Sequence, residues 1–136
     1  MNELKINYFL LILNIFFLLY FSFQLLVFTD EFAIKNIGFF NHAVAGLAEI
    51  IGIIFLSLSL GMIYSMFNSM HTQIPLYLSI FLIEFILSIN FWRYVITDAP
   101  GEATISIIQF NALIFSFISL TMLLLIYRIK KTRRKK

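Results

Sequence analysis

Four long runs of mostly apolar residues dominate this chain, and short polar links join them. The runs cover about residues 6–28, 39–67, 74–97 and 104–129, and each exceeds the ~20 residues that a helix needs to cross a bilayer. Within lipid, only helices and closed barrels satisfy every backbone polar group internally, and barrel strands need only ~9–11 residues. The sequence therefore predicts an all-α membrane protein, with four transmembrane helices in an up-down-up-down bundle.

The composition predicts one transmembrane unit over residues 1–136 and leaves no room for a separate soluble domain. Hydrophobic residues make up 61% of the chain and charged residues 12%, against ~45–50% and ~25% in soluble domains. The first run is longer than the ~7–15 apolar residues of a signal peptide, so we expect it to be retained as a helix. Cysteine is absent, which excludes disulfides and thiolate chemistry.

Basic residues gather at one end of the predicted bundle. Seven of the ten Lys and Arg residues lie in Arg128–Lys136, mostly in a predicted tail over residues 130–136, and Lys5 lies at the same end. The opposite end has two basic residues, Lys35 and Arg93, and acids in both of its links. The positive-inside rule therefore predicts a multi-pass protein of the inner (plasma) membrane with both termini in the cytoplasm. Such a tail suits anionic lipid. Because no polar fold accompanies it, we expect no nucleic-acid partner.

The second run carries an acid well inside it, at Glu49. An acid at that depth is costly and needs a structural or functional reason. At a rise of ~1.5 Å per residue, Glu49 and Glu84 of the third run both come out near the middle of a ~30 Å hydrocarbon core. Glu49 lies in a stripe at helical spacing, together with His42, Ala45, Gly46, Gly52 and Ile53. This stripe of small and polar residues predicts that Glu49 faces the bundle interior.

These two acids define a candidate polar site within the membrane. The residues predicted to share it come from all four helices and are Glu49, Glu84, Asn14, Ser88, Gln109 and Ser116. A charged carboxylate is costly to desolvate, so a carboxyl group at this depth can carry a proton, bind a cation or donate a hydrogen bond to a quinone. The alternative is that both acids only hydrogen-bond neighbouring helices and hold the bundle together.

A second candidate site lies at the acidic end of the predicted bundle, near the outer interface. It consists of His42, Arg93, Asp98 and Glu102. The only two histidines, His42 and His71, fall at opposite faces of the membrane in this prediction, whereas a haem held by two histidines needs both at one depth. Because cysteine is absent as well, we expect no self-contained metal site.

Two stretches give a resemblance to a known family. Residues Ala45–Leu56, AGLAEIIGIIFL, resemble the second helix of the DoxX-like group of small four-helix membrane proteins, which often carries a Glu before a Gly-rich apolar run. Residues Arg93–Gly101, RYVITDAPG, are similar to the third-helix exit of related uncharacterised families. The resemblance implies a membrane subunit, in some members associated with quinol-oxidising or redox complexes, with Glu49 as the family's helix-two acid. No redox ligand accompanies that acid in this sequence.

Three functional hypotheses follow, and the lipid bilayer is a partner in all of them. The first is an accessory subunit of a membrane complex, with no catalysis of its own and with a quinone-linked redox complex as the suggested setting. The second is a small proton-coupled transporter that works as a dimer through Glu49, because so few helices need a second copy to enclose a path. Against it, the sequence has no clear pair of interrupted helices of the kind that builds many transporter sites. The third is an enzyme that acts on a lipid or quinone headgroup at the outer interface.

Overall fold

The computed structural model describes residues 3–99, 101 and 103–133, which are mostly helical and contain no strand. The helices, in chain order, are α1 (Glu3–Val27), α2 (Thr29–Asn36), α3 (His42–Phe67), the short 3-10 helix η1 (Met70–Gln73), α4 (Ile74–Ile96) and α5 (Ile105–Arg133). Four of them, α1, α3, α4 and α5, are long and apolar enough to cross a membrane. The predicted fold class, an all-α bundle of four spanning helices, is confirmed.

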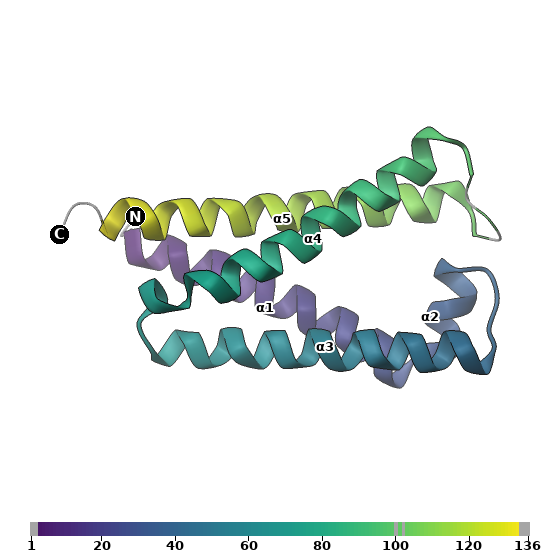
Figure 1. Ribbon diagram of the computed structural model, residues 1–136, viewed down its shortest axis with the longest axis horizontal. Coiled ribbons are helices and arrows are strands. Elements are labelled where there is room, and N and C mark those ends of the chain that lie inside the picture. The colour runs from purple at the N-terminus through teal and green to yellow at the C-terminus, as the bar shows by residue number, and fades with distance from the viewer. Residues whose placement is uncertain (1–2, 100, 102, 134–136) are drawn as a thin grey trace.

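The bundle has two distinct ends (Figure 1). The start of α1 and the end of α5 lie at one end, which we call the terminal end. Helix α2 and the link between α4 and α5 lie at the other end, which we call the far end. The spanning helices pack chiefly as two pairs, α1 with α3 and α4 with α5, and α1 packs against α5 to join them. In the membrane-spanning part of α1 and of α5, half of the residues are buried within the bundle. In α3 and in α4 the buried share is only 22%. The centre of the bundle is therefore the α1–α5 seam, and α3 and α4 lie on its flanks.

An aromatic cluster fills the far half of the α1–α5 seam. Phe17 and Phe21 of α1 contact Phe115 of α5, with ring centroids 5.0 Å and 5.1 Å apart. Phe91 of α4 contacts Phe115 from the other side at 5.5 Å. Edge-on and tilted ring pairs of this kind contribute stability beyond that from the burial of apolar area. Phe115 therefore ties three of the four spanning helices together.

A glycine lets α1 and α3 approach each other closely. A Cβ atom added at Gly52 would lie 2.8 Å from Cγ of Leu26 and 3.1 Å from Cβ of Leu25, which is closer than packed carbon atoms come. The Ser22 hydroxyl donates a hydrogen bond to the Gly52 carbonyl oxygen at 2.9 Å. Small residues and polar side chains are the usual means of helix association in lipid.

The polar link between the first two apolar runs, over residues 29–38, is mostly helix, α2. Asp30 and Glu31 lie in its first turn and Lys35 in its last, a charge order that complements the helix dipole. Gly38, with φ at +96°, ends the segment in the left-handed conformation that glycine adopts without strain.

The ends of the later helices also differ in detail from the prediction. The capping residue of α3 is Asn41, whose Oδ1 accepts a hydrogen bond from the Val44 backbone N–H at 2.9 Å. Thr72, of a residue type that often caps helices, lies within η1, where its hydroxyl donates a hydrogen bond to the Ser69 carbonyl oxygen, and it does not cap α4. The basic segment continues α5 as far as Arg133.

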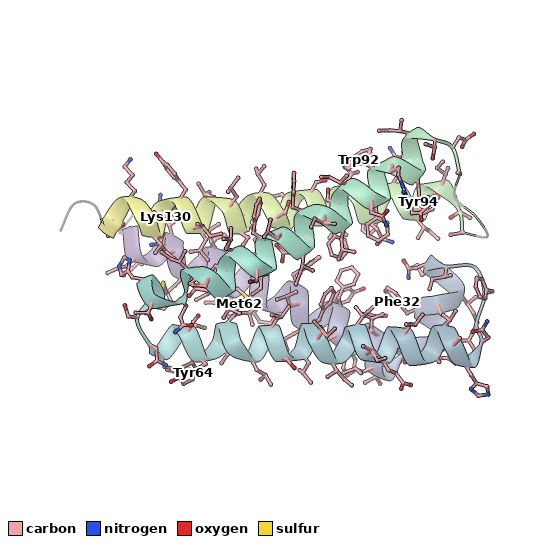
Figure 2. The ribbon with its side chains drawn as sticks, in the orientation of Figure 1. Phe32, Met62, Tyr64, Trp92, Tyr94 and Lys130 are labelled. Atoms are coloured by element: carbon pink, nitrogen blue, oxygen red, sulfur yellow. The ribbon has the colours of Figure 1, made fainter. Side chains whose placement is uncertain are left out.

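Tyr77 is buried, although its place near a helix end predicts an interfacial position. It is fully buried, and its hydroxyl donates a hydrogen bond to Oγ of Ser65 at 2.8 Å. The Ser65 hydroxyl in turn donates to the Met62 carbonyl oxygen. Figure 2 shows Met62 directed between α3 and α4 and Tyr64 directed away from the bundle. This chain of bonds holds α4 against α3 near the terminal end, close to the link that joins them.

Candidate functional site

The predicted intramembrane site is divided between two places in the structure. Ser88 and Ser116 meet between α4 and α5, with their hydroxyl oxygens 2.6 Å apart. The indole N–H of Trp92 donates to the same Ser116 oxygen at 3.0 Å, and the Ser116 hydroxyl lies 2.7 Å from the Ala112 carbonyl oxygen. These four residues form a polar contact that fixes the register of α4 against α5.

Glu84 lies one turn from Ser88 and is almost completely buried, with 1% of its surface exposed. Neither of its carboxyl oxygens has a hydrogen-bond partner among the described residues. Buried polar groups nearly always have a partner, and one that has none is costly. Glu84 is therefore a buried carboxyl group that makes no hydrogen bond within the described structure.

Asn14 brings a second unmet group to the same layer. Its amide N–H₂ donates to the Leu10 carbonyl oxygen at 2.8 Å and to the Thr121 hydroxyl at 3.0 Å, while its Oδ1 is buried without a partner. Helices α4 and α5 run in opposite directions, and Ser88 faces Ser116. Glu84, four residues before Ser88, therefore lies at about the level of Leu120 and Thr121. Polar side chains of α1, α4 and α5 thus lie at about one level, where three buried oxygen atoms, two of Glu84 and one of Asn14, have no hydrogen-bond partner among the described residues.

The expectation that Glu49 faces the interior is wrong. Its side chain is exposed on α3. The buried face of α3 follows Ala48, Gly52 and Phe55, and Glu49 lies about 100° around the helix from Ala48. Because α3 begins at His42, Glu49 is also only ~10 Å from its far end by helical rise. It is therefore neither level with Glu84 nor beside it.

Gln109, the remaining member of the predicted site, is also exposed, near the far end of α5. In soluble proteins a polar stripe marks the solvent side, but here lipid surrounds the bundle and both faces of a spanning helix are apolar. Hydropathy therefore carries little information about which face of such a helix is buried.

The predicted outer-interface site is not assembled. His42 begins α3 at one side of the far end, whereas Arg93 and Asp98 lie at the end of α4 on the other side, where Figure 2 labels Trp92 and Tyr94. The Arg93 guanidinium lies 4.8 Å from the centre of the Tyr94 ring, a cation–π contact. Asp98 is exposed with φ at +48° and takes part in the turn after α4. Glu102, the fourth member, lies outside the described residues.

A pocket at the far end was not predicted from the sequence. It has a volume of about 550 Å³ and lies between α1, α2 and the start of α5. We call it the far-end pocket. Phenylalanine side chains from all three helices contribute to its walls, namely Phe21, Phe32 and Phe110. Its polar lining residues are Gln24, Glu31, Lys35, Asn36, Ser106 and Asn111. The sequence gives little indication of this pocket, because its lining residues come together only when α2 folds back over the ends of α1 and α5.

The contacts of Asn36 with α5 and of Phe32 with α1 hold α2 in place beside the far-end pocket. The amide N–H₂ of Asn111 donates to Oδ1 of Asn36 at 2.9 Å. The Asn36 N–H₂ donates to the Phe32 carbonyl oxygen, also at 2.9 Å. The Phe32 ring meets Phe21 edge-on at 6.2 Å. The wall of the pocket is therefore fixed to the α1–α5 seam.

A second pocket lies at the terminal end, with a volume of about 460 Å³ and with Asn7, Asn68 and His71 among its lining residues. Nδ1 of His71 is buried without a hydrogen-bond partner in the described structure. The Arg128 Nε donates to Oδ1 of Asn7 at 2.9 Å and joins the two ends of the chain. Within the described part of the chain, no three His, Asp or Glu side chains are grouped as metal ligands would be.

No family model matches this chain, and neither a curated protein nor a solved structure matches it. The resemblance to the DoxX-like group therefore stays a prediction.

Proposed function

We propose that this chain is an accessory subunit of a larger integral-membrane complex and has no catalysis of its own. The observation that carries the proposal is the exposure of Glu49 on a helix that is long and apolar enough to span the membrane. A carboxyl group that faces lipid is costly, and burial against a polar group of another helix removes that cost.

The surface around Glu49 suits such a contact. Gly46 precedes Glu49 by three residues, and a Cβ atom added there would meet no atom within 4 Å. A neighbouring helix can approach closely at such a glycine. Only 22% of the membrane-spanning part of α3 is buried within the bundle, so the rest of the helix is free to contact another protein. We call the face that carries Gly46, Glu49 and Ile53 the Glu49 face.

The rival proposal puts a second copy of this chain against the Glu49 face. In that arrangement the paired Glu49 carboxyls could carry protons, and the dimer would be a small proton-coupled transporter. The same exposure of Glu49 supports both proposals, so the identity of the partner decides between them.

Site-specific crosslinking in the membranes of cells that make the protein tests this directly. A photocrosslinking amino acid replaces Ile53, which is 55% exposed on the Glu49 face, or Phe117, which is 61% exposed on α5 and serves as the matched control. We expect a discrete product of a different integral-membrane protein from position 53 and none from position 117. A product of twice the chain's mass would support the transporter, and crosslinks to lipid alone from both positions would refute the partner proposal.

Substitutions of Glu49 then separate titration from hydrogen bonding. If Glu49 only holds the partner by a hydrogen bond, Glu49→Gln should keep the crosslink and Glu49→Leu should lose it. If a proton on Glu49 is needed, Glu49→Gln should assemble normally while losing pH-dependent flux in liposomes. The extracted complex should also be analysed for bound quinone, because the proposal of a quinone-linked redox complex rests on the resemblance alone.

We also propose that both termini lie in the cytoplasm and that the membrane is the inner (plasma) membrane. This rests on the charge bias, since Lys5 and the basic residues of Arg128–Lys136 lie on the side of the chain ends while Asp30, Glu31 and Asp98 lie in the opposite links. A reporter fused after Lys136 should be active only as a cytoplasmic protein. Activity of a reporter that works only outside the cytoplasm would reverse the assignment.

A further inference from the structure

The far-end pocket has the size and position of a site for the headgroup of an amphiphile. Its volume of about 550 Å³ falls within the ~300–1,000 Å³ of ligand pockets. It lies where α1 ends at Val27 and α5 begins at Ile105, which is the level at which a spanning helix passes from hydrocarbon to headgroups. One side of a bound amphiphile could therefore remain in lipid while its head entered the pocket.

Two opposite charges line this pocket. Glu31 and Lys35 both belong to α2, both line the pocket and both are exposed. Their spacing of four residues places them on one side of the helix, about 5–6 Å apart at their Cβ atoms. Among the described residues, neither side chain has an ion-pair partner. Both charges are therefore available to a ligand that carries a positive and a negative group close together.

The amide groups of the pocket add both donors and acceptors. Asn111 uses one N–H on Asn36, so its second N–H and its carbonyl oxygen remain available. Gln24 also lines the pocket with a complete amide group. Amide oxygens accept hydrogen bonds from an ammonium group, and amide N–H groups donate to phosphate oxygens. The walls, by contrast, are aromatic and suit the glycerol backbone and the first methylene groups of a lipid.

We propose that the far-end pocket binds one phospholipid whose headgroup carries a phosphate and a primary ammonium group, as phosphatidylethanolamine does. Lys35 binds the phosphate, Glu31 accepts hydrogen bonds from the ammonium group, and the acyl chains leave the pocket along Phe110 and Ile114 of α5. An anionic headgroup without an ammonium group would place negative charge next to Glu31. A choline headgroup has no N–H to donate to Glu31 or to the amide oxygens. A quinone, which is uncharged, would leave both charges unused.

The test is native mass spectrometry of the purified full chain, titrated with phosphatidylethanolamine, phosphatidylcholine or phosphatidylglycerol of identical acyl chains. We expect one tightly retained phosphatidylethanolamine, bound at least about tenfold more tightly than the other two lipids. A factor of ten is the difference expected from one charge-assisted hydrogen bond. Equal retention of the three lipids, a preference for phosphatidylglycerol, or displacement of the lipid by an added quinone would overturn the proposal.

Substitutions in α2 test whether the preference for phosphatidylethanolamine arises in the far-end pocket. Glu31→Gln should remove the preference for ethanolamine over choline, and Lys35→Gln should weaken binding of all three lipids about tenfold. Asp30→Asn is the matched control, because Asp30 is an exposed acid on the same helix that does not line the pocket. Circular dichroism confirms that each variant is folded. A preference that survives both pocket variants, or that Asp30→Asn abolishes, would place the lipid elsewhere and refute the site.

Discussion

Replacing Gly52 by alanine tests whether the close contact between α1 and α3 sets the stability of the bundle. The added Cβ would lie 2.8 Å from Cγ of Leu26 and 3.1 Å from Cβ of Leu25. The Cβ of Leu25 can retreat only if its backbone moves, so the two helices must separate or Leu26 must change rotamer. Overpacking of this kind costs ~1–3 kcal/mol. Alanine is also a better helix former than glycine by ~1 kcal/mol, which offsets part of that cost.

Gly46→Ala is the control that cancels the difference in helix propensity between alanine and glycine. Gly46 lies in the same helix, and a Cβ atom there meets nothing within 4 Å. The difference in unfolding free energy between the two variants therefore isolates the contact, and we expect Gly52→Ala to be the less stable by ~1–3 kcal/mol. Reversible unfolding in mixed detergent micelles, followed by circular dichroism and by the fluorescence of the single tryptophan, Trp92, measures both variants. Equal stability, or a more stable Gly52→Ala, would show that α1 and α3 are not held at this distance.

Two further substitutions test polar groups in the interior by the same assay. Tyr77→Phe removes the hydrogen bond from the Tyr77 hydroxyl to Ser65 and should lower the unfolding free energy by ~0.5–1 kcal/mol, as the loss of an interhelical bond in lipid does. The control Tyr64→Phe, at an exposed position, should leave the unfolding free energy unchanged. Equal losses of stability in the two variants would refute a role for the bond. Glu84→Met removes a buried carboxyl group that has no hydrogen-bond partner in the described structure, and it should raise the unfolding free energy by ~1–3 kcal/mol. A clear loss of stability would instead mean that a water molecule or another partner hydrogen-bonds Glu84.

The four spanning helices could be predicted from the sequence because span length and hydropathy are properties of one helix at a time. The eight residues of α2 are too few and too polar to give that signal. The acids Asp30 and Glu31 at its start and Lys35 at its end indicate a helix by their order, but a surface loop with charged residues has a similar composition.

The candidate site was harder to predict, because it depends on how each helix is rotated. The burial of Glu84, Ser88 and Asn14 agrees with the expected polar interior, whereas Glu49 and Gln109 are exposed. Glycine and alanine appear on more than one side of α3, so a stripe through Glu49 and a stripe through Ala48 fit the sequence equally well. Only the contact of Gly52 with α1 selects between them, and that contact involves residues about 26 positions away in the chain.

The pairing of α1 with α3 and of α4 with α5 has a consequence for how the protein is made. Each pair consists of spanning helices that follow one another along the chain, so the first pair can enter the membrane and associate while the second is still being synthesised. The seam between α1 and α5 joins residues more than 100 positions apart, as the bond from Asn14 to Thr121 shows, and it closes last. A chain interrupted at Ser69, in the link between the pairs, should therefore assemble from two separately expressed halves, each inserted as a helical hairpin.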